Sequence, residues 1–474
     1  MARRRSSRKP KTSDSKTRPR RGGFPIHNAP LPKGLKTDNQ NAAGIDIGAT
    51  QHYVAIPEGR DEACVRCFGT FTSDLHAIAE WLADCGITTV AMESTGVYWI
   101  PLFELLESSG FEVKRVEPGK LKRAPGRKTD VLDCQWIQEL HTYGLLEGSF
   151  LPDQQIGVLR CYMRQRDTLV RYAGQHIQHM QKVLEQMNIK LTEVVTDITG
   201  ATGMAIIDAI LGGERDPQKL AALRDRRCKN DESTIALALE GNCSEHHLFV
   251  LRQVVESYRF YHRQIADVDE MIESHLKTFT DKSDGQKLTY RPRKRKLRNS
   301  EPRFDMRKYL HQMIGMDLTE IPGFGGAALL GIVAEVGLDM SPWPTEKHFA
   351  SWLCLCPGNH KTGGRQNRGK TATRPTKSHA ATLFRLGAQS ILRSDCALGA
   401  FGRRLRTRLG APKAITAVAH KLSIIYYNAL KYGRQYVDQG AENYERQYRQ
   451  WAIKGLRRRA EQLGFDLTPT SKAG

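Results

Sequence analysis

Apolar residues between positions 43 and 150 occur first in short runs and then at helical spacing. Short apolar runs bounded by turn residues are typical of strands, and they lie at residues 44–48, 53–56, 64–71, 88–93 and 111–116. Apolar residues three and four positions apart predict helices before each of the last two strands, over residues 74–85 and 97–108. Three strands, a helix, a strand, a helix and a strand predict an α/β domain with a central mixed sheet.

From residue 151 to residue 281 the apolar positions follow a longer helical stripe. Spacings of three, four and seven relate its first members, which are Leu159, Met163, Leu169, Ile177, Met180, Val183, Leu184 and Met187. The stripe is interrupted near residues 200–213 and resumes over residues 248–276. Such a stripe favours packing or a dimer seam over a cofactor site, so the sequence predicts two long antiparallel helices that form a coiled-coil arm.

Charge and a loss of apolar residues mark the remaining boundaries. Residues 1–42 combine arginine runs with proline and serine, which predicts a disordered basic tail. A second basic run, RPRKRKLR, lies within a predicted linker loop over residues 282–310. Residues 311–434 return to helical spacing and predict a mainly α C-terminal domain, and residues 435–474 are a polar, basic tail.

The 474-residue chain is strongly basic, with 72 Lys and Arg against 51 Asp and Glu and a formal charge of +21. Its length is enough for several domains with buried cores. The charge predicts a polyanionic partner, with nucleic acid as the first candidate, and the N-terminal tail is either a solubility tail or an arm that grips phosphates. No apolar stretch is long enough for a membrane span or a secretion signal. We therefore expect an intracellular protein without membrane contact, with its ten cysteines reduced.

Cysteine and histidine spacing gives little support for a structural metal. Cys64 and Cys67 form a CxxC pair, but the second pair that a structural zinc site needs is missing from the sequence. Cys243, His246 and His247 are better explained as positions on the surface of a helical segment.

Four acidic residues are the main chemical signal. Asp46 lies inside an apolar strand, where an unpaired carboxylate is costly to bury, and Glu93 ends the strand predicted to lie beside it. Asp130 and Asp133 are three positions apart at the start of a predicted helix and can face the same side. Asp130 alone could be a first-turn acid favoured by the helix dipole. Together, two strand acids and two helix acids at one sheet edge predict a Mg²⁺ site suited to phosphodiester chemistry.

A glycine-rich turn, IPGFGG, precedes an apolar run over residues 327–336. It has the form of a helix-hairpin-helix motif, in which the backbone around Gly323, Gly325 and Gly326 and the start of a helix direct N–H groups at a phosphate. The alternative is an ordinary glycine turn between packed helices.

Basic clusters after the hairpin fit phosphate binding better than base readout. The first contains Arg365, Arg368, Lys370, Arg374 and Lys377, and the second contains Arg403, Arg404, Arg406 and Arg408. No GxxxxGK[ST] pattern occurs, so ATP binding is not implied. The stretch CPGNHKTGGR places the hydroxyl of Thr362 among a histidine, a lysine and two glycines. Taken alone, Thr362 is either a reactive group or a turn residue.

Several stretches of the sequence, in this order, resemble the DEDD transposases of bacterial insertion sequences, which are bridge-RNA-guided DNA recombinases. They are GIDIG with Asp46, MESTG with Glu93, RKTDVLDCQW with Asp130 and Asp133, IPGFGGAALLGIVAEVG, FASWLCLCPGN and LGAFGRRLRTRLGAPKAITAVAHKL. The resemblance extends over residues 43–432, and such an ordered set is highly specific.

The resemblance implies a RuvC-like, ribonuclease-H-type domain over residues 43–150, a coiled-coil segment and a C-terminal transposase domain. It implies that the four acids bind Mg²⁺ and that a C-terminal serine attacks a DNA phosphate, forming a covalent protein–DNA intermediate. It also implies a structured non-coding guide RNA that pairs with donor and target DNA. Lys128, close to the helix acids, and Lys361, beside Thr362, are added to the expected nucleic-acid contacts.

Thr362 occupies the position of the family serine. A threonine hydroxyl can act as a nucleophile when a base or a metal activates it, although its methyl group crowds the attack and restricts χ1. Three interpretations are open: Thr362 is the nucleophile, the chain is a weakened or inactive copy, or a neighbouring hydroxyl such as Thr371 or Ser378 replaces it. We favour the first because His360, Lys361 and two glycines keep the chemistry of the loop.

The sequence thus predicts an RNA-guided DNA transposase that excises and inserts its own element. We expect a homo-oligomer, a dimer or a tetramer, because recombination must break four strands, and we expect it in the bacterial cytoplasm, associated with the nucleoid. The alternatives are a RuvC-like junction endonuclease that uses water and leaves no adduct, and a non-catalytic nucleic-acid-binding protein. The four acids oppose the second, because carboxylates weaken a surface that only binds phosphates.

Overall fold

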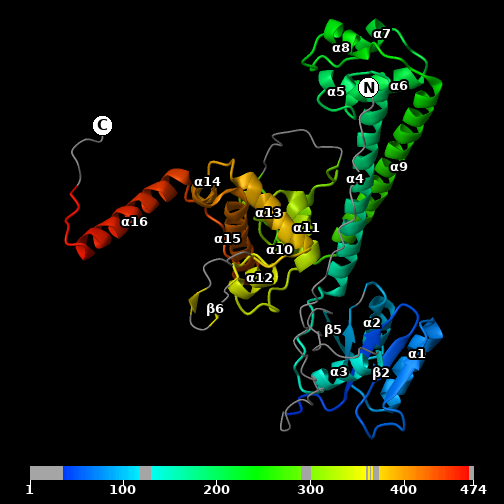
Figure 1. Ribbon diagram of the computed structural model, residues 1–474, viewed down its shortest axis with the longest axis vertical. Helices are drawn as coiled ribbons and strands as arrows, with labels where there is room; N and C mark the ends of the chain where they lie inside the picture. The colour runs from blue at the N-terminus through cyan, green and yellow to red at the C-terminus, as the bar shows by residue number, and fades with distance from the viewer. Residues whose placement is uncertain are drawn as a thin grey trace, which may run out of the picture. The chain divides into compact units, whose positions relative to one another are not determined.

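The computed structural model describes residues 36–468 except for Thr95 and residues 118–129, 290–299, 359–360, 363–364 and 367–372. For Lys361, Thr362, Arg365 and Gln366 it describes the backbone alone. The chain divides into two compact units, Met1–Phe150 and Leu151–Gly474 (Figure 1). Most of the predicted N-terminal tail and the RPRKRKLR run lie outside the described residues.

In the described part of the first unit, a mixed sheet of five strands has the order β3-β2-β1-β4-β5. The strands are β1 (Ala42–Ile47), β2 (His52–Ala55), β3 (Val65–Phe68), β4 (Thr89–Glu93) and β5 (Glu112–Val116). β2 is antiparallel to β1 and to β3, whereas β4 is parallel to β1 and to β5. The prediction of a central mixed sheet is confirmed, and β1, which carries Asp46, lies in its middle.

Helices of the first unit pack on this sheet; they are α1 (Thr72–Asp84), α2 (Trp99–Ser108) and α3 (Asp130–Thr142). The start of α1 is fixed by Asp74, whose carboxylate accepts a hydrogen bond from the Phe71 N–H at 3.0 Å. α3 approaches β1 so closely that a Cβ on Gly44 would lie 2.2 Å from the backbone nitrogen of Gln138. A glycine is therefore required where the helix crosses the strand.

The end of α3 also holds the chain that precedes β1. The N–H groups of Asp38 and Asn39 both donate to the carbonyl of Thr142 at 3.0 Å. Residues 36–42 belong to the stretch predicted to be a disordered tail, yet these hydrogen bonds tie part of it to the domain. The predicted boundary at position 43 therefore leaves out residues that are attached to the domain.

The arm of the second unit consists of α4 (Gln154–Gln186) and α9 (Glu245–Leu276), which lie side by side (Figure 1). His275 Nε2 lies 2.8 Å from the carbonyl of Gln155 near one end, and His176 stacks on Tyr261 further along, with ring centroids 5.4 Å apart. Residues early in α4 thus meet residues late in α9. The predicted pair of long antiparallel helices is confirmed.

Short helices connect α4 to α9 at the far end of the arm: α5 (Leu191–Val194), α6 (Ala201–Leu211), α7 (Pro217–Ala221) and α8 (Glu232–Leu239). The interruption of the stripe predicted near residues 200–213 does lie between the two long helices, but the segment itself forms a short helix, α6, which the stripe did not predict. Gly200 and Gly212 occupy the two caps of α6, so the glycines delimit a helix instead of interrupting one. Ile206 and Ile210 of α6 are buried in the apolar core at this end of the arm.

The C-terminal helices surround an aromatic core. In chain order they are α10 (Met306–Ile314), the 3₁₀ helix η2 (Leu318–Glu320), α11 (Gly326–Val336), α12 (Glu346–Trp352), α13 (His379–Ile391), α14 (Ala397–Leu409) and α15 (Ala411–Tyr432). Phe349, Phe384, Tyr426 and Tyr427 are fully buried, and the Tyr427 hydroxyl donates to the carbonyl of Trp343 at 2.7 Å. The short strands β6 (Lys361–Thr362) and β7 (Arg365–Gln366) come between α12 and α13 along the chain.

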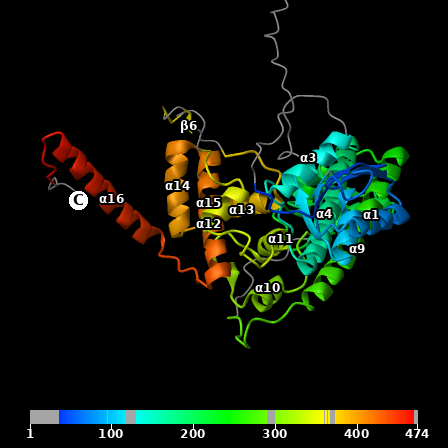
Figure 2. The same cartoon turned by 90° about the horizontal axis from the view of Figure 1, so that it is seen from below.

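The stretch predicted to be a polar C-terminal tail contains a helix, α16 (Ala441–Gln462). It begins beside α14 and extends away from it in both views (Figures 1 and 2). Among the helices that the structure describes, none is long and apolar enough to cross a lipid bilayer.

Candidate active site

Asp46 and Glu93 lie on one face of the sheet, toward the same end of neighbouring parallel strands. Gly44 pairs with Ala91 in the β1–β4 ladder, and each acid stands two positions further along its strand. Side chains alternate along a strand, so residues two apart share a face. Asp46 therefore shares the face of Gly44, and Glu93 shares the face of Ala91. Both acids are half-buried.

α3 covers this face of the sheet. A Cβ on Gly44 would lie 2.4 Å from the carbonyl oxygen of Cys134 in α3. Ala91 of β4 belongs to a buried apolar cluster with Ile137, which is one turn further along α3. The face that carries the two strand acids is therefore the face on which α3 packs.

The direction of α3 brings its first turn toward the strand acids. Its last turn lies at the opposite end of the sheet, where His141 Nε2 is 2.9 Å from Thr89 Oγ1 at the start of β4. Its first turn carries Asp130, which is exposed, and Asp133, which is half-buried. The helix acids are thus at the end of α3 that faces the carboxyl ends of β1 and β4, near Asp46.

The charges of these acids contribute to the raised pKa values of two neighbouring side chains, Cys134 and Tyr53. Burial, with the charges of Asp46 and Asp133 adding to it, raises the pKa of the Cys134 thiol to about 12. Tyr53 pairs with Asp46 across the β1–β2 ladder. A hydrogen bond to a cysteine of β3 raises the pKa of Tyr53 most, and the charge of Asp130 raises it further. Three of the four acids therefore act electrostatically on the same small region.

The donor set suits a hard divalent cation, because carboxylate oxygens are the ligands that Mg²⁺ prefers. In the described parts of the chain, however, no three Asp, Glu, His or Cys side chains gather closely enough to hold a metal ion. Neighbouring carboxylates repel one another without a cation between them. An ion bound here would have to draw the carboxylates together from their present positions.

Thr362, the predicted nucleophile, lies in β6 of the second unit, where its backbone pairs with Arg365 of β7. Ser378, one of the alternative hydroxyls, caps α13 by accepting a hydrogen bond from the Ala381 N–H at 3.3 Å. Its hydroxyl therefore has a structural role. Several residues predicted to act near Thr362 or the acids lie outside the described residues: Lys128, His360, Gly363, Gly364, Arg368, Lys370 and Thr371.

Several of the predicted phosphate-binding arginines contact their own chain. Arg374 and Arg403 donate to backbone carbonyls at 3.2 and 2.7 Å. Arg404 donates to the hydroxyl of Tyr444 in α16 at 3.0 Å. Arg406, in the last turn of α14, is exposed. Arg403 and Arg404 therefore help to hold the C-terminal helices together.

The glycine turn before α11 is shaped by close packing. Gly323 has a φ of 87°, and a Cβ there would lie 2.7 Å from the carbonyl oxygen of Gly387 in α13. Gly325, at the N-cap of α11, is exposed with open space around it, and Gly326 begins the helix. Packing against α13 thus explains Gly323, and the start of α11 is the part of the turn that is open to a ligand.

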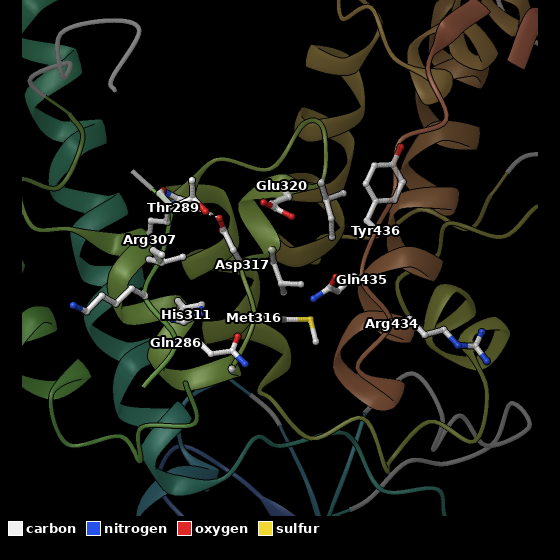
Figure 3. Close-up of a pocket in the computed structure, with 15 residues that line it drawn as sticks. Gln286, Thr289, Arg307, His311, Met316, Asp317, Glu320, Arg434, Gln435 and Tyr436 are labelled. Atoms are coloured by element: carbon white, nitrogen blue, oxygen red, sulfur yellow. Dashed lines mark hydrogen bonds and ion pairs between the residues drawn. The ribbon is translucent and has the colours of Figure 1, made fainter. Parts of the chain in front are cut away.

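A pocket of about 220 Å³ lies beside this turn (Figure 3). Arg307 forms part of its wall, donating to the carboxylate of Asp317 at 2.9 and 2.6 Å and to the carbonyl of Thr289 at 2.9 Å. Burial opposes ionisation of Asp317, but these and other hydrogen bonds lower its pKa overall. Glu320 and Arg434 add further charges of both signs. The pocket is therefore polar without being a dedicated anion site.

A charged cluster around the buried Glu335 links the arm to the C-terminal helices and was not predicted from the sequence. Glu335 of α11 accepts hydrogen bonds from Arg164 of α4 at 2.8 and 2.9 Å, and Arg160 lies 3.5 Å from the same carboxylate. His379, the first residue of α13, lies 3.7 Å from Glu335 and 3.4 Å from Asp167. The available signal was an acid inside the apolar run LLGIVAEVG, together with charges spaced by four and three residues on α4.

The charges of this cluster determine one another's ionisation. Burial opposes ionisation of Glu335, but His379, Arg164 and Arg160 lower its pKa to about 2. The nearby carboxylate of Glu335 raises the pKa of His379 most, and the charge of Asp167 adds to it against the effect of burial. Burial raises the pKa of Asp167 itself. The cluster connects α4, α11 and the start of α13. In the chain, α13 follows strands β6 and β7, and β6 contains Thr362.

Two protein families match segments of this chain. Residues 43–189 match the DEDD transposases of IS110 type, described as transposase, and residues 316–401 match the transposase IS116/IS110/IS902 family. A search among curated proteins found no match. The first match contains the four acids, and the second contains the glycine turn and Thr362. The chain belongs to the IS110 family of DEDD transposases, the transposases of insertion sequences.

Proposed function

We propose that this transposase is a Mg²⁺-dependent, RNA-guided DNA recombinase that cuts and rejoins DNA through a covalent protein–DNA intermediate. The observation that carries the proposal is the convergence of Asp46 and Glu93, by the β1–β4 register, with the first turn of α3 on one face of the sheet. The charge of +21 supports nucleic-acid partners. Guidance by RNA rests on the family resemblance, and an oligomeric state rests on the need to break four strands.

In this mechanism the carboxylates of Asp46, Glu93, Asp130 and Asp133 hold the ion. When bound, Mg²⁺ supplies Lewis-acid stabilisation of the charge on the phosphate oxygens. Thr362 is the nucleophile: its Oγ1 attacks the phosphorus of a DNA phosphodiester, a threonyl–phosphate bond forms, and the bond to one deoxyribose oxygen breaks. The hydroxyl proton passes to a neighbouring base, and the departing oxygen takes up a proton. Rejoining reverses these steps with a deoxyribose hydroxyl of another strand.

Substitution of Thr362 tests the nucleophile, with Thr362→Ala as the variant and Thr362→Ser as its control. A DNA substrate nicked so that the cut strand diffuses away traps the adduct, which peptide mass spectrometry then locates. We expect an adduct at residue 362 in the wild type and in the serine variant, which lacks the crowding methyl group. The alanine variant should bind DNA and form no adduct. An adduct that persists in the alanine variant removes Thr362 from the mechanism.

The same experiment separates the alternatives. Mg²⁺-dependent cleavage without any adduct in the wild type favours a junction endonuclease that uses water. Binding without cleavage under any metal condition favours a non-catalytic nucleic-acid-binding protein. RNA guidance is tested by sequencing the RNA that copurifies with the expressed protein; one structured species is expected, and a mixture without common structure contradicts guidance.

A further inference from the structure

α16 carries a row of aromatic residues that is longer than the contact covering it. Tyr444, Tyr448 and Trp451 are spaced by four and three positions and therefore lie on one helical face. Arg404 of α14 donates to the Tyr444 hydroxyl at 3.0 Å, and its guanidinium lies over the rings of Tyr444 and Tyr448. Trp451, the next member of the row, leaves 64% of its surface exposed.

The part of α16 beyond Tyr448 has no cover within the described residues of the second unit. No residue of α16 is buried, and in both views the helix extends away from α14 (Figures 1 and 2). In proteins most of the stability of a helix comes from packing of one of its faces. Tryptophan is enriched at surfaces that a partner covers.

The charge of α16 indicates the kind of partner. Exposed basic residues outnumber the acidic ones: Arg446, Arg449, Lys454, Arg457, Arg458 and Arg459 against Glu442, Glu445 and Glu461. Arg458 is seven positions after Trp451 and lies on the same face, about 10 Å along the helix. Gly455, between them on that face, has open space around it. Along this face, Trp451 thus provides an aromatic ring, Gly455 an open position without a side chain, and Arg458 a positive charge.

The contact with α14 covers only the first part of this row. Phe401 and Arg404 of α14 contact α16 in the same order along both helices, Phe401 at Tyr444 and Arg404 as far as Tyr448. The two helices therefore run in the same direction from this contact, and α16 continues beyond it.

We propose that Trp451 and Arg458 of α16 form a binding surface for single-stranded nucleic acid. One base stacks on the indole of Trp451, and the neighbouring phosphates lie against Arg458 and the arginines beside it, which is the combination that sequence-tolerant single-strand binding uses. A second copy of the chain is a poorer occupant, because two identical basic faces repel each other. The inference rests on the proposed nucleic-acid function, but α16 lies outside both segments that match the transposase families.

The test compares full-length Trp451→Ala with Phe249→Ala, which removes an aromatic side chain of equal exposure, 64%, from α9. The probes are fluorescently labelled oligo(dT) and oligo(U) of about 20 nucleotides, longer than one such site, and a duplex DNA of equal length. Fluorescence anisotropy gives each dissociation constant at several salt concentrations. The oligo(dT) and oligo(U) arms distinguish a displaced DNA strand from a single-stranded part of an RNA.

Trp451→Ala should weaken binding of at least one single strand about 5-fold to 100-fold, the range for one stacked base, with little effect on the duplex. The salt dependence of single-strand binding should be the same for Trp451→Ala as for the wild type, because no charge is lost. A variant that combines Arg457→Ala, Arg458→Ala and Arg459→Ala should show a weaker dependence of its affinity on salt concentration. Trp451→Phe should restore most of the affinity, and circular dichroism should be that of the wild type.

The proposal is overturned if Trp451→Ala binds the single strands with the same affinity as Phe249→Ala. It is also overturned if Trp451→Ala loses as much affinity for the duplex as for the single strands. A lower molar mass of Trp451→Ala in light scattering assigns the face to a second copy instead. Adduct formation at saturating DNA is expected to persist in Trp451→Ala, so failure of this inference is separate from failure of the Thr362 mechanism.

Discussion

At the scale of single residues, packing decides how the helix acids reach the strand acids. Gly44 stands two positions before Asp46, and its missing side chain lets Cys134 and Gln138 of α3 lie directly on β1. The run GIDIG predicts a strand, but it does not say that a helix far along the chain will cross the glycine. The acids themselves were identified from their residue type and setting, because a carboxylate in an apolar strand is unusual.

Gly44→Ala should destabilise the first unit. The new methyl group would lie 2.2 Å from the Gln138 nitrogen and 2.4 Å from the Cys134 oxygen, both backbone atoms that cannot move independently. We expect its free energy of unfolding in urea to fall by at least about 1–3 kcal/mol. Gly174→Ala is the control: it lies inside α4 with open space around it and should gain up to about 1 kcal/mol. Unchanged stability of Gly44→Ala would contradict the close approach of α3.

At the scale of elements, the sequence located most helices and strands but not their connections. The strands of the first unit and the pair α4 and α9 follow the periodicity of their apolar residues. α6 lies where the apolar stripe is interrupted, and α16 lies in a stretch predicted to be a tail because it is polar and basic. Glu335 links α4, α11 and α13, so its partners are far apart in the sequence and no local pattern identifies them.

The His379 cluster predicts a pH dependence of stability. The folded state raises the pKa of His379 above its ordinary value of about 6.5. Its protonated form therefore stabilises the fold fully below that value, and the contribution is lost as pH rises through the raised folded pKa. The contribution of His379 is measured as the difference between the wild type and a His379 variant in urea unfolding at about pH 5.5 and about pH 8.5, because burial lowers the pKa of other histidines, such as His141, and gives them the opposite pH dependence. Glu335, with a pKa of about 2, stays ionised over this range.

His379→Gln should remove that part of the pH dependence. His348→Gln is the matched control, because His348 is exposed and bonds only with Thr345 among the hydrogen bonds described, at 2.9 Å. It should leave the wild-type pH dependence unchanged. Identical pH profiles for His379→Gln and the wild type would show that the imidazolium does not stabilise the link between α13, α11 and the arm.

At the scale of the whole molecule, the two units carry different parts of the proposed chemistry. The acids belong to the first unit, and Thr362, in the β6–β7 strand pair, belongs to the second. Recombination that breaks several strands needs several such pairs. The protein therefore supplies complete active sites either within each chain or between subunits of an oligomer, and mixing experiments distinguish the two.

Asp46→Ala and Thr362→Ala should each abolish adduct formation, the first by removing a metal ligand and the second by removing the nucleophile, with RNA binding retained. When the two variants are coexpressed with different tags and purified by both, adduct formation should partly return, because intact acids of one subunit then meet an intact Thr362 of another. No recovery in oligomers proven to be mixed would place each complete site within one chain.

The sequence by itself determined the periodicity of the strands and helices, the positive charge, the four acids and the unusual threonine, because each of these is a property of residue types and short spacings. The tertiary structure decided which face of the sheet carries the acids, the approach of α3 over Gly44, the Glu335 cluster and the exposure of Trp451 at the end of the aromatic row of α16. These features depend on contacts between segments distant in the chain, and packing, which local periodicity does not encode, determines such contacts.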